Sequence, residues 1–279
     1  PNYYEASAQL YETFQQWSSP SAIFIGFNNI NFDEPFLRQA LYQNLMPELY
    51  MTVTNNNTRM DVFDILRLVS VYSPEHIKFN QDDQGYPILK LDQIFKLNNI
   101  SISYEAGPHD AVFDSLVTLE LNKILSIRCP QIWNAAYEFR LRETPKKFML
   151  SNLVFTNTTF WGRRPTIKAQ TLIGGIPGKN HHYLVYNLFF DPKKLQDLDD
   201  KELLKKMNDG AKRICEVFDG SKSKTLLSES YCFKDTKFAE IGVDELRLRA
   251  NFIKNNEEFC TRLIQLHLDN QKSWPEPFH

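Results

Sequence analysis

Residues 21–35 read SAIFIGFNNINFDEP. The stretch opens with an apolar run of β-branched and aromatic residues, which is typical of a strand buried on both faces of a partly parallel sheet. Asn28 and Asn29 end this run, and the following Phe-Asp-Glu-Pro has the acidic residues and the proline of a helix start. The pattern therefore predicts a strand-to-helix junction at Asp33. At this edge of an open α/β sheet a carboxylate can serve a metal ion, although a simple helix cap is the alternative interpretation.

The rest of the chain extends this junction into an α/β fold. Apolar residues recur with helical spacing at 7–17, 36–45, 61–71, 90–97 and 110–125. Beyond residue 128 the pattern changes to β-prone segments at 148–156, 165–173 and 183–190, followed by helical patterns at 201–217 and 244–268. We therefore predict three domains: an α/β domain at 1–127, a small β-barrel at 128–198 and the start of a helical domain at 199–279.

The composition narrows the class of protein. The chain has 279 residues, of which 42% are hydrophobic and 24% charged, as in ordinary globular proteins, so a disordered or fibrous chain is excluded. The longest apolar run, residues 22–27, is too short to cross a membrane. No signal-peptide pattern opens the chain, and Cys129, Cys215, Cys232 and Cys260 form no CxxC pair. Reduced thiols and a cytoplasmic protein are expected.

Charge is distributed unevenly along the chain. Residues 1–127 hold 7 Lys and Arg against 15 Asp and Glu, whereas residues 128–279 hold 25 against 19. This asymmetry indicates a polyanion partner for the basic half and carboxylates for metal ions in the acidic half. The alternative is that the two halves simply differ in surface charge.

A second candidate segment lies at the start of the helix predicted at 110–125. It reads His109-Asp110-Ala111-Val112-Phe113-Asp114 and follows Gly107-Pro108. Hydrolysis of a phosphodiester by two metal ions needs carboxylates to hold the ions and a base to deprotonate water, and histidine titrates near neutrality. Read by themselves, His109 and Asp110 are ordinary residues of a helix N-terminus.

Together the two segments resemble a known family. The first segment contains Asn-x-x-Phe-Asp at 29–33, and the second contains His-x-x-x-x-Asp at 109–114. This pair looks like motifs II and III of the DEDD-type 3′→5′ exonucleases of the histidine subclass. The sequence around these motifs resembles bacterial exodeoxyribonuclease I, with TRMDVFD at 58–64 and DDQGYP at 82–87. The resemblance implies an RNase H-like exonuclease domain, a barrel of the Src-homology type and a helical domain.

The resemblance also implies roles for individual residues. Asp33 and Asp114 would be metal carboxylates, His109 the general base, and Asn29 a residue near the terminal nucleotide. The cofactor would be Mg²⁺, with two ions per site and Mn²⁺ as a substitute. Arg59 and Asp61 match a family pattern, but we interpret them as a buried ion pair that supports the fold at least as readily as contacts to DNA.

One family feature is missing. Motif I, Asp-x-Glu, supplies the other two metal carboxylates in the family, and only Glu5 and Glu12 precede Asn28 here. The expectation from the sequence is therefore an internal fragment of a longer enzyme, without the first strands of the sheet and without activity on its own. A non-catalytic module that binds single-stranded DNA or protein and has lost motif I is the alternative.

The basic half offers candidate contacts to DNA. Proteins that bind single strands combine cationic grooves with aromatic faces, and Trp161, Arg163 and Arg164 fit this combination, although a merely solvated surface would have the same sequence. The resemblance implies a monomeric enzyme of DNA repair and recombination that degrades single-stranded DNA. It also implies binding of the acidic tail of single-stranded DNA-binding protein.

Overall fold

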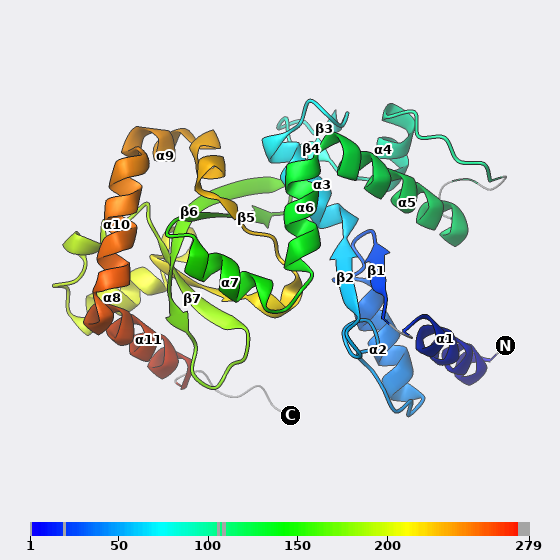
Figure 1. Ribbon diagram of the computed structural model, residues 1–279, viewed down its shortest axis with the longest axis horizontal. Coiled ribbons are helices and arrows are strands. Elements are labelled where there is room, and N and C mark those ends of the chain that lie inside the picture. The colour runs from blue at the N-terminus through cyan, green and yellow to red at the C-terminus, as the bar shows by residue number, and fades with distance from the viewer. Residues whose placement is uncertain (1, 19–20, 105–106, 108–109, 273–279) are drawn as a thin grey trace. The chain divides into compact units, whose positions relative to one another are not determined.

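The computed structural model describes residues 2–18, 21–104, 107 and 110–272, and its contacts divide the chain into two compact units, residues 1–141 and 142–279 (Figure 1). The predicted boundary after residue 127 lies inside the first unit, because a helix at 130–139 packs against two earlier helices. The boundary predicted after residue 198 lies inside the second unit. The division into three domains stays a prediction.

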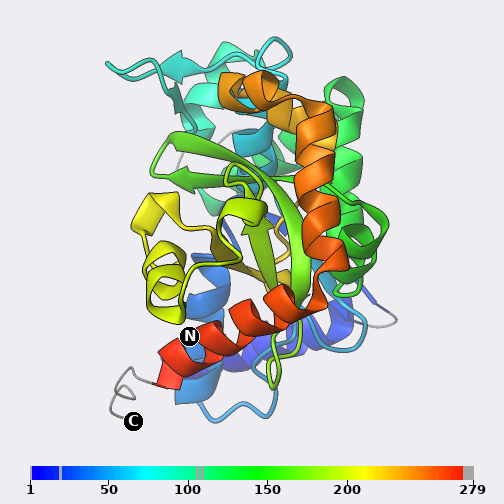
Figure 2. The same cartoon turned by 90° about the vertical axis from the view of Figure 1, so that its left-hand side faces the viewer.

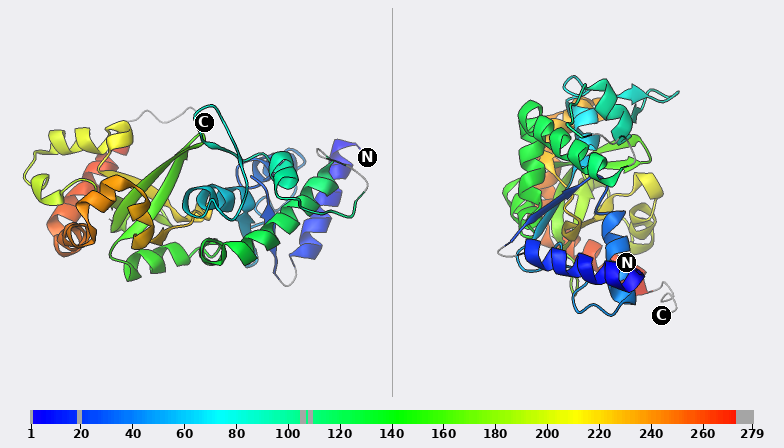
Figure 3. Two further views of the ribbon diagram at one scale, coloured as in Figure 1. Left: turned by 90° about the horizontal axis from the view of Figure 1, so that it is seen from above. Right: turned by 90° about the vertical axis from the view of Figure 1, so that its right-hand side faces the viewer.

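The first unit is a mixed α/β arrangement. Its helices and strands, in chain order, are α1 (Tyr3–Trp17), β1 (Ile23–Gly26), α2 (Asp33–Gln43), β2 (Thr58–Asp61), α3 (Val62–Tyr72), β3 (Asn80–Gln81), β4 (Pro87–Ile88), α4 (Leu91–Leu97), α5 (Ala111–Arg128) and α6 (Pro130–Phe139). β1 and β2 pair in parallel, whereas β3 and β4 form a short antiparallel hairpin. Figure 3 shows α1 beside α2, and the Ser7 hydroxyl at this contact accepts a hydrogen bond from the Asn44 side chain.

β1 differs from its prediction in one respect. The strand was predicted to be buried on both faces, but Ile23 and Ile25 are each 39% exposed. Phe24, which points to the other face, stacks on Phe14 of α1 with ring centroids 5.2 Å apart. Ile23 and Ile25 point to one face of β1, and this face has little cover among the residues that the structure describes.

The core of the first unit forms where α3, α5 and α6 meet. Asp61 accepts the backbone N–H of Phe63 and so caps α3. The apolar face of α3 then packs with α5 and α6. The fully buried side chains here include Val62, Ile65, Leu66, Val69, Leu121, Leu125 and Ile132. This core fixes β1 and β2 relative to α5, because both α3 and α5 also contact β1.

The second unit is built on an antiparallel sheet. Its elements are α7 (Thr144–Ser151), β5 (Phe155–Trp161), β6 (Arg164–Gly175), β7 (His182–Asn187), η1 (Pro192–Lys194), α8 (Asp200–Met207), η2 (Gly210–Lys212), β8 (Cys215–Asp219), η3 (Gly220–Lys222), β9 (Leu227–Ser228), η4 (Glu229–Lys234), α9 (Thr236–Ile241), α10 (Val243–Asn255) and α11 (Glu257–Lys272). The strand order is β8-β7-β6-β5-β9. In Figure 2, α10 in orange and α11 in red run along this sheet, and both contact β6.

Three predicted elements of this unit need correction. Phe148 lies in α7, so the first strand begins only at Phe155. The helix predicted at 201–217 ends at Met207, because Gly210 takes a positive φ of 48° and Cys215–Asp219 pairs with β7 as a strand. The helix predicted at 244–268 is two helices. The chain breaks at Asn256, whose side chain accepts the backbone N–H of Phe259 in the next helix.

A buried polar network crosses this sheet. The carboxylate of Glu216 on β8 forms an ion pair with Lys168 on β6 and accepts hydrogen bonds from the side chains of Gln170 and Asn157. The side chains of Lys168 and Glu216 are only 11% and 12% exposed. Buried charges of this kind are tolerated only when they are paired and hydrogen-bonded, so the network fixes β8 relative to β5 and β6.

Cys129, Cys215 and Cys232 are buried, Cys260 is half-buried, and burial raises the pKa of the Cys232 thiol to about 12. In the described part of the chain, no helix combines the length and the apolar character needed to cross a bilayer.

Candidate functional site

Asp33 is the first residue of α2 and lies just beyond the carboxyl end of β1. The residue before it, Phe32, is the N-cap, and the side chain of Phe32 makes no capping hydrogen bond. The alternative that Asp33 serves only as a helix cap is therefore wrong. Its side chain is exposed and available for other chemistry.

The loop between β1 and Asp33 is held by backbone hydrogen bonds. Asn28 has a left-handed φ of 60°, which Asn tolerates better than most residues. The N–H of Phe32 donates to the carbonyl of Asn28 at 3.0 Å, and the N–H of Glu34 donates to the carbonyl of Asn29 at 2.9 Å. The chain thus turns back tightly before α2 begins.

Asp61 adds a side-chain anchor to this loop. Its Oδ1 accepts the N–H of Asn28 at 2.7 Å, and its Oδ2 accepts the N–H of Ile30 at 3.3 Å. Burial raises the pKa of the Asp61 carboxyl to about 6; the nearby charge of Asp64 adds to the rise, and the three N–H donors oppose it. The same carboxylate therefore serves both β1's loop and the start of α3.

Glu34 is the second buried carboxylate near Asp33. It forms an ion pair with Arg59 of β2, and its Oε2 lies 3.6 Å from Nη1 of Arg38. Burial raises the pKa of Glu34 above its usual value, although both arginines lower it. A buried ion pair was one of the roles expected for Arg59 and Asp61. Arg59 does form such a pair, but its partner is Glu34, whereas Asp61 accepts backbone N–H groups.

The second predicted segment is described only from Asp110 onward, so His109 lies outside the described residues. Asp110 caps α5 and accepts the N–H groups of Val112 and Phe113, as an ordinary helix start requires. Asp114 stands in the first turn of α5 and is half-buried. α5 contacts β1, the strand that precedes α2 and Asp33 in the chain.

The described residues do not complete a metal site around these carboxylates. Within residues 2–18, 21–104, 107 and 110–272, no group of three or more His, Cys, Asp or Glu side chains is close enough to hold an ion. The roles of Asp33 and Asp114 as metal carboxylates stay predictions.

Asn29 is positioned by its neighbours. Its side-chain oxygen is buried and accepts no hydrogen bond from the residues that the structure describes. A side chain on Gly26 would collide with Asn29, so the end of β1 must be a glycine for Asn29 to lie where it does. The amide oxygen of Asn29 is therefore the acceptor in this loop that lacks a donor within the described chain.

The predicted DNA contacts of the second unit lie at one hairpin tip. Trp161 pairs with Arg164 at the end of β5 and β6, and Gly162 turns the chain with a φ of 60°. Trp161 is 86% exposed. The hairpin brings Trp161, Arg163 and Arg164 together, as the prediction of an aromatic and cationic surface requires.

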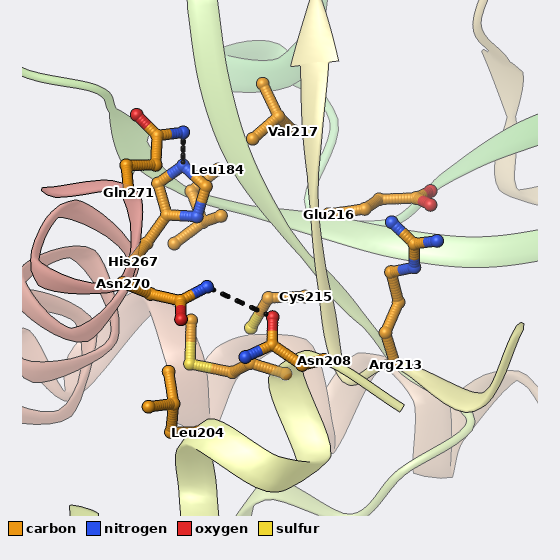
Figure 4. A pocket seen from close by; sticks show the side chains of 11 residues that line it. Leu184, Leu204, Asn208, Arg213, Cys215, Glu216, Val217, His267, Asn270 and Gln271 are labelled. Atoms are coloured by element: carbon orange, nitrogen blue, oxygen red, sulfur yellow. Dashed lines mark hydrogen bonds between the residues drawn. The ribbon is translucent and has the colours of Figure 1, made fainter. Parts of the chain in front are cut away.

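The second unit also contains a cavity of about 560 Å³. Figure 4 shows His267, Asn270 and Gln271 of α11 on one side of it and β8 on the other. Nδ2 of Asn270 donates to Oδ1 of Asn208 at 3.3 Å, and burial with the charge of Lys179 lowers the pKa of His267. None of the predicted site residues that the structure describes lines this cavity.

Two residues near Asp33 were missed as parts of this arrangement. Sequence reasoning treated Glu34 only as an acidic residue of a helix start and gave Asp61 no link to the loop after β1. The sequence did contain a signal for these partners. Arg59 and Asp61 are two positions apart on one strand, β2, and Asp61 is also the N-cap of the helix that follows. Two charged residues on one face of a buried strand need partners nearby.

The fold is that of exonuclease I. Solved structures of exonuclease I match this fold along almost the whole chain. The exonuclease I from Methylocaldum szegediense gives a TM-score of 0.75 at 22% identity, and the match covers 95% of this chain and 58% of that enzyme's chain. The Escherichia coli enzyme in complex with a dA16 oligonucleotide also gives a TM-score of 0.75, at 19% identity, over 99% of this chain and 59% of the other. At these identities the likeness establishes the fold alone.

Sequence comparison gives curated relatives of this chain that are named exodeoxyribonuclease I. The chain is 31% identical to exodeoxyribonuclease I of Buchnera aphidicola subsp. Schizaphis graminum over 139 residues, which are 50% of this chain and 28% of that protein. It is 25% identical to exodeoxyribonuclease I of Escherichia coli over 194 residues, 67% of this chain and 40% of that protein. No family model matches the chain. The resemblance to exodeoxyribonuclease I is thus confirmed, and the matches span well under half of these relatives' length.

Proposed function

We propose that this chain forms part of a 3′→5′ exonuclease that hydrolyses single-stranded DNA to mononucleotides, with a role in DNA repair and recombination. One observation carries the proposal: Asp33 is exposed beyond a parallel strand, is not used as a helix cap, and lies in the segment that matches the family motif. The similarity to exodeoxyribonuclease I supports the same activity.

In this proposal Asp33 and Asp114 are metal carboxylates, and His109 is the general base for the attacking water. Such an enzyme uses Mg²⁺ to activate water and to stabilise the charge that develops on the phosphate. The metal requirement is itself a proposal, to be tested by chelation with EDTA and restoration with Mg²⁺ or Mn²⁺.

The remaining residues would bind and orient the strand. The unsatisfied amide oxygen of Asn29 suits a hydrogen-bond donor of the terminal nucleotide. Trp161 offers an exposed ring on which a base can stack, with the cations of Arg163 and Arg164 beside it for the phosphates. A solved complex of exonuclease I with dA16 supports single-stranded DNA as the ligand class.

The fold supports further parts of the proposal. The first unit would be an RNase H-like exonuclease domain, and the antiparallel sheet would be part of a small barrel followed by the start of a helical domain. A solved structure described as an ExoI/SSB-Ct complex supports the tail of single-stranded DNA-binding protein as a partner. We further propose a monomeric cytoplasmic enzyme.

The test is release of nucleotides from single-stranded DNA labelled at its 3′ end. The 279-residue chain and the product of the complete reading frame are assayed side by side with Mg²⁺. Asp33→Asn and Asp114→Asn are each expected to reduce kcat by more than about a hundredfold, because each removes a negative ligand. Asp92→Asn is the matched control, since Asp92 also lies in the first turn of a helix, α4.

The outcomes separate the alternatives. Wild-type activity in Asp33→Asn and Asp114→Asn would overturn the roles given to these residues. Binding of single-stranded DNA by both proteins without any cleavage would contradict the enzyme and support the non-catalytic module.

A further inference from the structure

Two residues on one face of β2 contact the segment around Asp33. Arg59 and Asp61 are two positions apart on this strand, so their side chains point to the same side. Asp61 reaches the loop before Asp33, and Arg59 reaches Glu34, which follows it. Asp33 therefore lies between two anchors that come from a single strand.

Asp61 makes more contacts than a helix cap needs. A cap requires one oxygen to accept an N–H of the first turn, and Oδ1 does this for Phe63 at 3.0 Å. The same oxygen accepts the N–H of Asn28, and Oδ2 accepts the N–H of Ile30. The second oxygen thus serves the loop alone.

The loop depends on this acceptor. Ile30 is buried, so an N–H that lost Oδ2 would have no water to replace it. Asn28 already has a left-handed backbone, which its surroundings must maintain. If this hydrogen bond were lost, the path of residues 28–32 would change, and with it the point at which α2 begins.

Glu34 supplies the second anchor. Its N–H donates to the carbonyl of Asn29, and its buried carboxylate is held by Arg59. The first turn of α2 is thus tied to β2 through a side chain as well as through the loop. Because Asp33 is adjacent to Glu34, its backbone cannot move without disturbing this ion pair.

We infer that Asp61 is a positioning residue, which holds the loop after β1 so that Asp33 projects from the start of α2 in its functional orientation, with the Arg59–Glu34 pair as the second anchor. This inference rests on the catalytic role proposed for Asp33. The contacts of Asp61 themselves are independent of that role.

Two substitutions separate positioning from helix capping. Asp61→Ser keeps an N-cap of equal quality for α3, but its single short oxygen cannot serve Asn28 and Ile30 together. Asp61→Asn keeps Oδ1 for Phe63 and Asn28 and places an NH₂ donor opposite the N–H of Ile30. Asp64→Asn, on the same helix, is the control for the loss of a negative charge.

The experiment uses the product of the complete reading frame. Its first readout is hydrogen exchange at the amides of Asn28, Ile30 and Phe63. In Asp61→Asn we expect faster exchange at Ile30 with Phe63 still protected, and in Asp61→Ser faster exchange at both Asn28 and Ile30. Unchanged protection of Ile30 in both variants would overturn the inference.

The second readout is steady-state kinetics on a single-stranded oligonucleotide. For both variants we expect kcat to fall by at least about tenfold with KM nearly unchanged, since small misplacements of a reacting group have effects of this size. Asp64→Asn should retain kcat and exchange rates. A wild-type kcat despite loss of loop protection would overturn the inference.

The two readouts distinguish this inference from the proposed function. If Asp33→Asn is as active as the wild type, the catalytic role of Asp33 fails, whatever the exchange data show. If Asp33→Asn is inactive and the Asp61 variants are fully active, the proposed function stands and the positioning role fails.

Discussion

The side chain of Asn29 occupies the space that a side chain on Gly26 would need. A Cβ on Gly26 would lie 2.6 Å from Cβ and 2.8 Å from Cγ of Asn29, closer than such atoms approach in proteins. Gly26 has no positive φ, so the requirement for glycine here is one of space and not of backbone conformation. The end of β1 and the loop before Asp33 are therefore fitted to each other.

Gly26→Ala tests this relationship. We expect the added methyl group to displace Asn29 and the loop, to lower the free energy of unfolding by about 1–3 kcal/mol, and to reduce nuclease activity more than stability. Urea unfolding and the assay on 3′-labelled DNA measure the two effects. Gly175→Ala is the control, because nothing lies within 4 Å of its added Cβ. A fully active Gly26→Ala protein would contradict the link between this contact and the site.

Asp61 should make stability depend on pH in an unusual direction. Burial raises the pKa of its carboxyl from 3.8 to about 6, so between these values the folded state binds more protons than the unfolded state. The contribution of Asp61 to the free energy of unfolding is therefore greatest below about pH 4 and falls by about 3 kcal/mol as the pH rises to about 6 and above. Asp61→Asn, which does not titrate, should lack this fall.

Urea unfolding of the wild type and Asp61→Asn between pH 4 and pH 7 measures the difference. Other titrating groups act alike in both proteins, so the wild type should lose stability relative to the variant as the pH rises. A constant difference across this range would show that Asp61 has an ordinary pKa.

Trp161→Ala should weaken binding of single-stranded DNA without affecting the fold. The ring is 86% exposed, so its removal leaves no cavity and should change stability by no more than about 0.5 kcal/mol. If a base stacks on it, the loss of about 1–3 kcal/mol raises Kd by roughly five- to 150-fold. Fluorescence anisotropy with a labelled oligonucleotide measures Kd.

Leu150→Ala is the control for this prediction, because Leu150 is another exposed apolar residue of the second unit. Equal Kd values for Trp161→Ala and Leu150→Ala would assign the hairpin tip to ordinary solvated surface.

Glu216→Ala should destabilise the second unit strongly. The change leaves the ammonium of Lys168 buried without its carboxylate, which costs about 3–5 kcal/mol. Replacing both residues, with Lys168→Met and Glu216→Leu, removes both charges and should recover part of this loss, because the side chains of Gln170 and Asn157 still lose their acceptor. Thermal unfolding of the single and double variants measures both effects. A single variant as stable as the wild type would mean that water reaches the Lys168 ammonium.

Local patterns predicted the start of this site well. The strand at 21–27 and the helix after Asp33 exist, because an apolar run and an acidic, proline-containing turn are signals carried by adjacent residues. The same holds for Asp110, which caps α5 as its place before the helix suggests. The two motif segments, together with the sequence at 58–64 and 82–87, indicated a resemblance to exodeoxyribonuclease I, which the comparison with curated relatives confirms.

Predictions that needed a non-local partner were less accurate. Residues 215–219 have enough helical spacing to extend the helix before them, but pairing with β7 makes them a strand. Tertiary context overrides local propensity in such segments. The prediction that β1 is buried on both faces was wrong for a related reason. How far each face of a strand is buried depends on which other elements pack on that face.

The amino-acid sequence by itself determined where strands and helices begin around Asp33, and its motifs indicated the resemblance to exodeoxyribonuclease I. Only the tertiary structure decided that Asp33 is free of a capping role, that Glu34 pairs with Arg59, and that Asp61 holds the loop after β1. The reason is physical. Caps and turns are made by residues within one helical turn of each other, whereas a buried carboxylate takes its partners from whichever strand the fold places beside it.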